Sequence, residues 1–348
     1  MPSHPEKACV EWRQGGFAQG EGAIAEIPIP VPSSRRENGA SDTANDSSFS
    51  NMTATLARVG EQTDILGESP LWNEIEQALY WVDIRRPALR RLDYASGQVD
   101  NWTMPDLVGS IALGDDGRLL VALPERVAAF DPRTGTMSTV ATPPTTIPGH
   151  RFNDGRCDRQ GRFWVGTMHN ITRAPEGVLY RLDPDGRMTA KHVGICIPNS
   201  LAWSPDGRTM YFADSLRYTI FAYDFDPETG EMSGERVFAT SSKPAFADGS
   251  TVDADGYLWN AEFNGWRVVR YAPDGHVDRV IDVPTHRPTC CAFGGPNLDV
   301  LYITTASQQM SAEELARQPL AGSLLAMEAG VRGLPEPRFP LSGLLPKE

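Results

Sequence analysis

Four oxygen-bearing side chains recur at one position of a repeated pattern. Glu68, Asn153, Asn199 and Asp248 each lie eight residues before a turn position that recurs along the chain. Taken singly, each would be read as a turn or capping residue, but the shared spacing favours a common site. Carboxylates and amides gathered away from water repel or stay unpaired unless a cation lies among them. Such oxygen ligands suit Ca²⁺, Mg²⁺ or Mn²⁺ and also admit Zn²⁺ or Fe²⁺, so the pattern predicts one divalent metal ion.

The turn that sets this count is a hairpin signal followed by a strand. Four of its copies are explicit: Asp116-Gly117, Gln160-Gly161, Asp206-Gly207 and Asp255-Gly256. Each precedes a short apolar run, as a hairpin turn precedes its second strand. The glycines are 44, 46 and 49 residues apart. Extending this register reaches Glu76 upstream and Leu298 downstream, which makes six units.

Each unit has room for four strands. Second turns of another kind lie between the first, as in Asp131-Pro-Arg-Thr-Gly135 and Asp226-Pro-Glu-Thr-Gly230. Two hairpins in about 45 residues is typical of a propeller blade. The chain is therefore predicted to be all-β, a six-bladed β-propeller. The first strand of each blade would line the central channel, so the residues that begin these strands, including Gly109 and Cys290, would meet at one end of the axis.

Charge and composition exclude several classes of partner. The net charge is −13, and no basic stripe is present that could bind nucleic acid or an anionic membrane surface. We find no apolar run of about 20 residues and no secretory signal, and we expect a cytoplasmic protein. The five cysteines have no metal-type spacing and suit reduced thiols.

Other catalytic machinery is hard to find. No G-x-S-x-G nucleophile elbow, glycine-rich phosphate loop or dinucleotide fingerprint is present. The six histidines show no metal-binding pair at helical spacing. His150 and His169 flank the Arg151 segment, and whether either contacts substrate is left open.

The chain divides by composition. Residues 1–53 have few apolar residues at any sustained period, and we expect a disordered extension there. Residues 54–348 would form the propeller, which would be the catalytic domain.

Seven motifs in order resemble the SMP-30/gluconolactonase/regucalcin-like family. They are Gly67-Glu68-Ser-Pro-Leu-Trp72, Tyr80-Trp-Val-Asp-Ile84, Arg151-Phe-Asn-Asp-Gly155, Gly161-Arg-Phe-Trp-Val-Gly-Thr-Met168, Pro198-Asn199, Asp248-Gly249 and Ala292-Phe-Gly-Gly295. The resemblance extends over roughly 56–346 and implies a six-bladed propeller with a single divalent metal.

The resemblance also implies roles for individual residues. Glu68, Asn199 and Asp248 match the metal ligands of the family. Arg151 matches a substrate-binding arginine, and Asn153 a substrate contact near the metal. The chain departs from some animal members, which have a glutamate shortly after Gly-Thr-Met, where it reads His169-Asn170-Ile171. We therefore count Asn170 as a substrate-binding candidate and expect sugar hydroxyls to be recognised differently.

The activity that the resemblance implies is metal-dependent hydrolysis of a sugar lactone to its aldonic acid. The metal would act as a Lewis acid, and Asp248 or a metal-bound hydroxide would activate the attacking water. Two alternatives stay open: a related metal-dependent esterase or organophosphate hydrolase, and a non-catalytic calcium-binding propeller. The lactone, the metal, the oligomeric state and the purpose of the N-terminal residues are not decided by the sequence.

Overall fold

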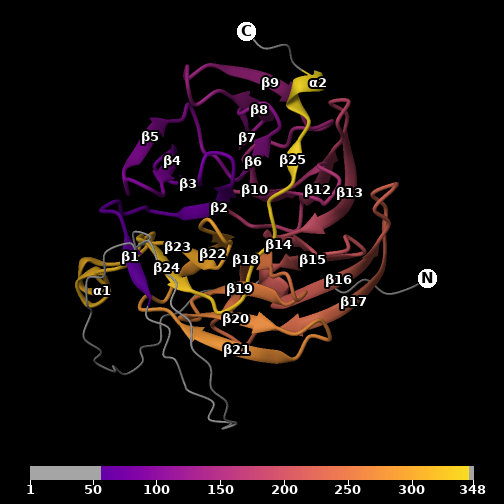
Figure 1. The fold of residues 1–348 in the computed structure, drawn as a ribbon. Coiled ribbons are helices and arrows are strands. Elements are labelled where there is room, and N and C mark those ends of the chain that lie inside the picture. Colours follow the sequence, from indigo (N-terminus) through magenta and orange to yellow (C-terminus); the bar gives the residue numbers. More distant parts are fainter. Residues whose placement is uncertain (1–55, 345–348) are drawn as a thin grey trace, which may run out of the picture.

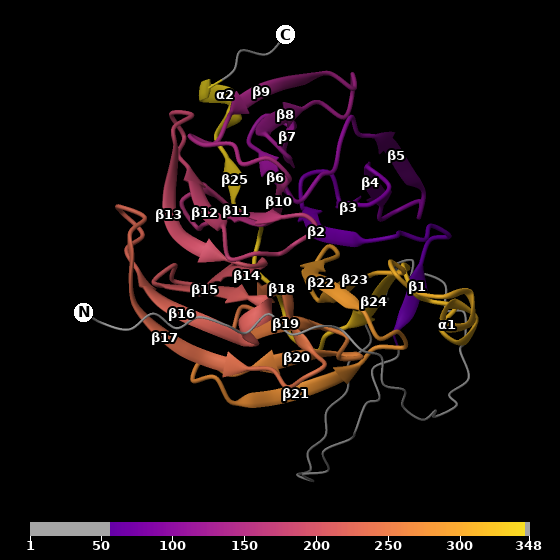
Figure 2. The same cartoon turned by 180° about the vertical axis from the view of Figure 1, so that it is seen from behind.

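Residues 56–344 of the computed structural model form six antiparallel β-sheets around a central axis (Figure 1; Figure 2 shows the same molecule from behind). Each sheet is one blade, so the predicted six-bladed β-propeller is confirmed. The predicted extension over residues 1–53 lies outside the described residues. No helix between residues 56 and 344 is long and apolar enough to cross a membrane.

The first strand of every blade lies innermost, and these strands contact one another in a closed ring. They are β2 (Gly67–Asn73), β6 (Ile111–Gly114), β10 (His150–Cys157), β14 (Pro198–Trp203), β18 (Phe246–Val252) and β22 (Pro288–Gly294). The second strands are β3 (Ala78–Asp83), β7 (Leu119–Leu123), β11 (Phe163–His169), β15 (Thr209–Asp214), β19 (Leu258–Phe263) and β23 (Val300–Thr305).

Two further strands complete each blade towards its outer edge. The third strands are β4 (Ala88–Asp93), β8 (Arg126–Phe130), β12 (Gly177–Leu182), β16 (Thr219–Phe225), β20 (Arg267–Tyr271) and β24 (Leu324–Glu328). The outer strands are β5 (Val99–Thr103), β9 (Met137–Ala141), β13 (Met188–Ile195), β17 (Met232–Thr240), β21 (Val277–Asp282) and β1 (Ala57–Val59). The short helices are η1 (Ser215–Arg217), α1 (Ala312–Arg317) and α2 (Leu341–Leu344).

Burial falls from the axis to the rim. All seven residues of β18 are buried, whereas β21 alternates between half-buried and exposed residues. Inner strands face neighbouring blades on both sides, which explains why their sequences are continuously apolar or hydrogen-bonded. Five tryptophans of the first and second strands are all buried: Trp72, Trp81, Trp164, Trp203 and Trp259.

A buried aspartate ties strands together within a blade. The Oδ2 atom of Asp253 accepts hydrogen bonds from Trp259 Nε1 at 2.9 Å and from Arg270 Nε at 2.9 Å. Asp64 holds Trp81 and Arg90 in the same way, each at 2.8 Å. Because both acceptor and donors are removed from water, these bonds favour one packing of the strands.

The predicted glycine turns all lie at one end of the axis, which we call the lower face. Gly117, Gly161, Gly207 and Gly256 have φ angles of +87°, +83°, +68° and +87°. This left-handed backbone favours glycine, which explains why the residue recurs in the pattern. The first strands run from the opposite end, the upper face, where their opening residues gather.

The ring is closed by the two ends of the described chain. β1 pairs antiparallel with β24, so residues from the start of the described chain form the outer strand of the sixth blade (Figure 1). This pairing covers an edge of β24 that would otherwise present unpaired backbone groups.

A C-terminal strap, residues 330–344, crosses the lower face (Figures 1 and 2). The Gly333 amide donates to the carbonyl oxygen of Leu298 at 2.7 Å. Further along, β25 (Arg338–Phe339) pairs in parallel with β6. The strap thus joins the lower end of the sixth blade to the second blade across the axis.

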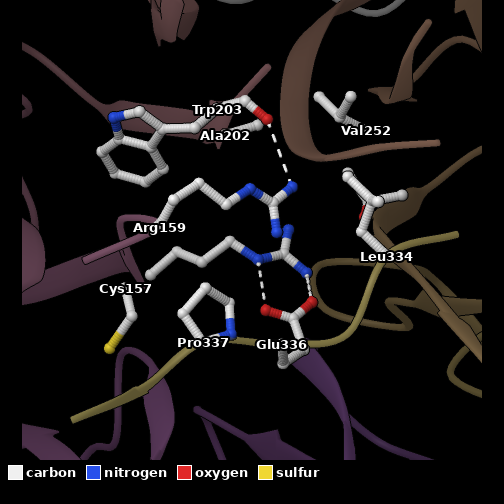
Figure 3. Close-up of a pocket in the computed structure, with 10 residues that line it drawn as sticks. Cys157, Arg159, Ala202, Trp203, Val252, Leu334, Glu336 and Pro337 are labelled. Atoms are coloured by element: carbon white, nitrogen blue, oxygen red, sulfur yellow. Dashed lines mark hydrogen bonds and ion pairs between the residues drawn. The ribbon is translucent and has the colours of Figure 1, made fainter. Parts of the chain in front are cut away.

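A largely buried ion pair, with side chains 13% and 9% exposed, anchors this strap. Arg156 Nε donates to Glu336 Oε2 at 3.2 Å, and the Nη2 atom of Arg156 also contacts the Glu336 carboxylate. Figure 3 shows Glu336 and Pro337 in the pocket at this end of the channel, beside Trp203 and Cys157. The Glu336 carboxylate raises the pKa of Arg156 despite the opposing effect of burial.

We expect Glu336→Gln to lower the free energy of unfolding by about 3 kcal/mol, because it leaves the Arg156 charge buried without its partner. Urea denaturation followed by tryptophan fluorescence measures the change. The matched control is Glu313→Gln, which removes an exposed ion pair to Arg317 and should change stability by less than about 0.5 kcal/mol. Equal effects of the two variants would show that the strap is not anchored by this pair.

Candidate active site

A break in strand pairing marks the upper end of the inner strands. The register of β2, β10, β14 and β18 shifts at this point, between Glu68 and Leu71, Phe152 and Gly155, Asn199 and Ala202, and Ala247 and Ser250. A bulge of this kind bends the strand and changes the direction of its side chains. The four residues singled out by spacing all lie in or beside these bulges.

Two bulges contain a serine in the left-handed conformation. Ser69 and Ser200, which follow Glu68 and Asn199, have φ angles of +51° and +61°. Their hydroxyls hold neighbouring blades: Ser69 Oγ accepts from the Ile111 amide at 3.1 Å, and Ser200 Oγ lies 2.6 Å from Ser250 Oγ. These contacts offset the backbone strain and fix the two preceding side chains.

Glu68 and Asp248 come from blades 1 and 5 and lie within electrostatic reach of each other. Burial raises the pKa of Glu68 to about 8, with a further contribution from the charge of Asp154. Burial also raises the pKa of Asp248 well above its ordinary value, and the charge of Glu68 adds to the effect. Glu68 keeps some accessible surface, whereas Asp248 is 6 % exposed. Two ionised carboxylates in this position are unstable without a cation.

Asn199 and Asn153 are oriented by hydrogen bonds. Asn153 Nδ2 donates to Asn199 Oδ1 at 2.8 Å and to the carbonyl oxygen of Pro198 at 2.9 Å. Asn199 Nδ2 donates to Ser215 Oγ at 2.8 Å, and this hydroxyl donates to the Ala247 carbonyl at 2.7 Å. The Asn199 carbonyl oxygen therefore keeps one lone pair for another ligand.

Arg151 joins this network to Asn170. Its Nε donates to Asn170 Oδ1 at 3.0 Å, and its Nη1 donates to Asn153 Oδ1 at 2.7 Å. Arg151 is 4 % exposed, and burial together with the charge of Arg85 lowers its pKa to about 9. The predicted substrate-binding residues Arg151, Asn153 and Asn170 thus form one hydrogen-bonded chain that ends on Asn199.

The two remaining register positions contribute no oxygen ligand. A Cβ atom on Gly109 would lie 2.3 Å from the Phe152 carbonyl oxygen, so only glycine allows β6 and β10 to approach this closely. Cys290 is a buried free thiol next to Gly249, and burial raises its pKa well above the ordinary value.

A divalent cation fits the donor set formed by Glu68, Asn199 and Asp248. Within residues 56–344, no three histidine, cysteine, aspartate or glutamate side chains could hold a metal ion on their own. The predicted set differs in kind, since it combines two carboxylates with one amide oxygen. Among the described residues neither carboxylate has an ion-pair partner, and both are destabilised when charged. A cation that prefers oxygen ligands would serve as the partner of both carboxylates and would stabilise their charged forms.

Spacing did not identify Asp154, a third carboxylate in this region. Its Oδ2 accepts a hydrogen bond from the Leu201 amide at 2.9 Å, and burial raises its pKa. Asp154 raises the pKa of both Glu68 and Asp248. It directly follows Asn153, and the bulge between Phe152 and Gly155 breaks the strict alternation of faces. The only sequence feature that could have pointed to Asp154 is the Asn153-Asp154-Gly155 tripeptide, which is typical of a bend in the strand.

The two flanking histidines lie edge to face beside the Arg151 segment, with ring centroids 5.5 Å apart. His169 Nδ1 accepts hydrogen bonds from the amides of Ile171 and Thr172 at 3.2 and 3.1 Å. His150 Nε2 lies 3.5 Å from Glu176 Oε2. These contacts shape the loop that carries Asn170.

Carboxylate, amide and arginine side chains thus gather at the upper end of the channel of a six-bladed propeller. Residues 66–307 match the model of the SMP-30/gluconolactonase/LRE-like region. The chain belongs to this family.

Named relatives agree over most of the chain. A 6-deoxy-6-sulfogluconolactonase of Pseudomonas putida is 38% identical over 292 residues, which cover 83% of this chain and 99% of the relative. An L-arabinolactonase of Azospirillum brasilense is 40% identical over 294 residues, 82% of this chain and 95% of the relative. The crystal structure of a calcium-binding regucalcin from Agrobacterium tumefaciens superposes with a TM-score of 0.78 at 31% identity, covering 81% of this chain and 96% of that one.

Proposed function

We propose that the protein hydrolyses the ring ester of a sugar lactone to the aldonic acid, with a divalent metal ion held by Glu68, Asn199 and Asp248. The observation that carries the proposal is the pair of carboxylates from blades 1 and 5, Glu68 and Asp248, whose pKa values are both raised by burial. The names of two relatives, a sulfogluconolactonase and an arabinolactonase, support the reaction class. The calcium-binding regucalcin supports a divalent cation.

Bound at these ligands, a divalent cation would act as a Lewis acid towards the lactone carbonyl. Arg151 and Asn153 would orient the ring, since both side chains are held rigid by the bonds to Asn170 and Asn199. Asp248 would take the proton of the attacking water, and a proton returned to the ring oxygen would complete cleavage of the ester C–O bond.

The test is acid release from five- and six-carbon aldonolactones, followed by pH-stat. Metal-stripped protein is compared with protein supplied with Ca²⁺, Zn²⁺, Mn²⁺, Mg²⁺ or Fe²⁺. We expect release well above spontaneous ring opening, and only with metal. Tight metal binding without any release would instead favour a non-catalytic calcium-binding propeller, and release from aryl esters or organophosphates alone would favour the other alternative.

A further inference from the structure

Three arginines from two blades gather at the upper face, and within the described part of the chain only Arg151 has a hydrogen-bond partner for its guanidinium group. Arg151 is bound to Asn170 and Asn153, as described above. Arg173 lies in the loop between β11 and β12, and Arg85 lies in the turn between β3 and β4. Their backbone amides are hydrogen-bonded. Across residues 56–344, neither side chain makes a hydrogen bond or an ion pair.

The three guanidinium groups lie close enough to affect one another. After burial, the charge of Arg85 lowers the pKa of Arg151 more than any other group does, although the two residues come from different blades. The charge of Arg85 also adds to burial in lowering the pKa of Arg173. Both Arg85 and Arg173 are half-buried, so water screens this repulsion incompletely.

The carboxylates deeper in the channel do not neutralise Arg85 and Arg173. Among the described arginines, only Arg151 lowers the pKa of Glu68 or of Asp248. A divalent cation at those carboxylates would itself balance two negative charges. Glu176, three residues beyond Arg173, lies beside His150 instead. The mouth of the site therefore carries surplus positive charge when the site is filled.

We infer that Arg85 and Arg173 bind an anionic group on the lactone, at the end remote from its carbonyl. The inference rests on the proposed function, which places the carbonyl beside Glu68 and Asp248. Guanidinium groups bind phosphate, sulfonate and carboxylate oxygens through paired N–H donors, and these anions share that chemistry. The substrate class is a sugar lactone with such a group on its terminal carbon.

The experiment compares gluconolactone with its 6-phosphate, its 6-deoxy-6-sulfonate and its 6-carboxylate, using metal-loaded full-length protein. We expect kcat/KM to be about 100-fold higher for at least one anionic lactone than for the neutral one, and the three arms identify which anion fits. Arg85→Gln and Arg173→Gln should each reduce the ratio of kcat/KM for the anionic lactone to kcat/KM for the neutral lactone about tenfold. Arg85→Lys keeps the positive charge and should reduce this ratio less.

The matched control is Arg86→Gln. Arg86 is exposed and adjacent to Arg85, but its Nη1 donates to the Thr63 carbonyl at 3.2 Å, so its removal should leave the ratio unchanged. Thermal unfolding of each variant excludes a general loss of structure.

A second readout separates this inference from the proposed function. Calorimetry with sorbitol 6-phosphate and sorbitol measures anion binding without hydrolysis. Tighter binding of the phosphate that is lost in Arg85→Gln supports the anion site even if no lactone is hydrolysed. Hydrolysis of neutral and anionic lactones at equal kcat/KM, with equal binding of the two sorbitols, overturns the anion site and leaves the lactonase proposal standing.

Discussion

Asp248→Asn is expected to lower metal-dependent lactone hydrolysis by about a thousandfold or more. The change removes the proposed base and one of two charged metal ligands, while the side chain keeps its volume. The metal-free variant should be at least as stable as the wild type, because one of two mutually repelling buried carboxylates becomes neutral. Initial rates by pH-stat and thermal unfolding after chelation measure both effects.

The control for this substitution is Asp255→Asn, in the lower-face turn of the same blade. The Asp255 side chain is 66% exposed, and the residue lies beyond Val252, where β18 ends on the lower face. The Asp255→Asn variant should hydrolyse lactones at the same rate as the wild type. Full activity in Asp248→Asn would exclude a catalytic or ligand role for this carboxylate.

The metal-free protein should lose stability as the pH rises from about 4.5 to about 8. The ordinary pKa of Glu68 is 4.5, and burial raises it to about 8 in the folded chain. Between these values the unfolded chain has released the proton and the folded chain still holds it, so raising the pH favours unfolding. This contribution is fully present below pH 4.5, and its complete loss above pH 8 amounts to about 5 kcal/mol.

Urea midpoints of chelated wild type and Glu68→Gln, measured from pH 5 to 8, isolate this effect. The difference between the two proteins removes the titration of all other groups. We expect the variant to gain on the wild type as the pH rises, and saturating metal to stabilise the wild type most at high pH. A difference that stays constant with pH would mean that Glu68 is an ordinary exposed carboxylate.

The blade pattern was readable from the sequence because turn geometry constrains residue type. The glycines at 117, 161, 207 and 256 occupy left-handed backbone, and the strand length between turn and bulge is fixed. Counting back from each turn therefore reached the upper end of each inner strand. Gly109 shows a limit of this method, since its position follows from the close approach of two strands and not from any ligand chemistry.

Asp154, Arg85 and Arg173 could not be predicted as site residues from the sequence, for different physical reasons. The bulge around Asp154 alters the alternation of faces, and spacing alone does not reveal a bulge. Arg85 and Arg173 affect each other's charge only because blades 1 and 3 surround the same axis. The strap could not be predicted either, because residues 330–344 have no strand period and their partners, such as Arg156 for Glu336, lie far away in sequence.

The position of β1 has a consequence for the order in which the molecule can be built. During synthesis, β1 leaves the ribosome before every other described strand, yet its partner β24 is made only after the other five blades are complete. The sixth blade therefore lacks β22, β23 and β24, the three strands that join β1 in it, until near the end of translation. Closure of the ring and docking of the strap are late events that depend on contacts of very high sequence separation. A nascent chain released before β24 is made would leave β1 without its partner and the first blade without its neighbour in the ring, which exposes strand edges and apolar surface that chaperones bind.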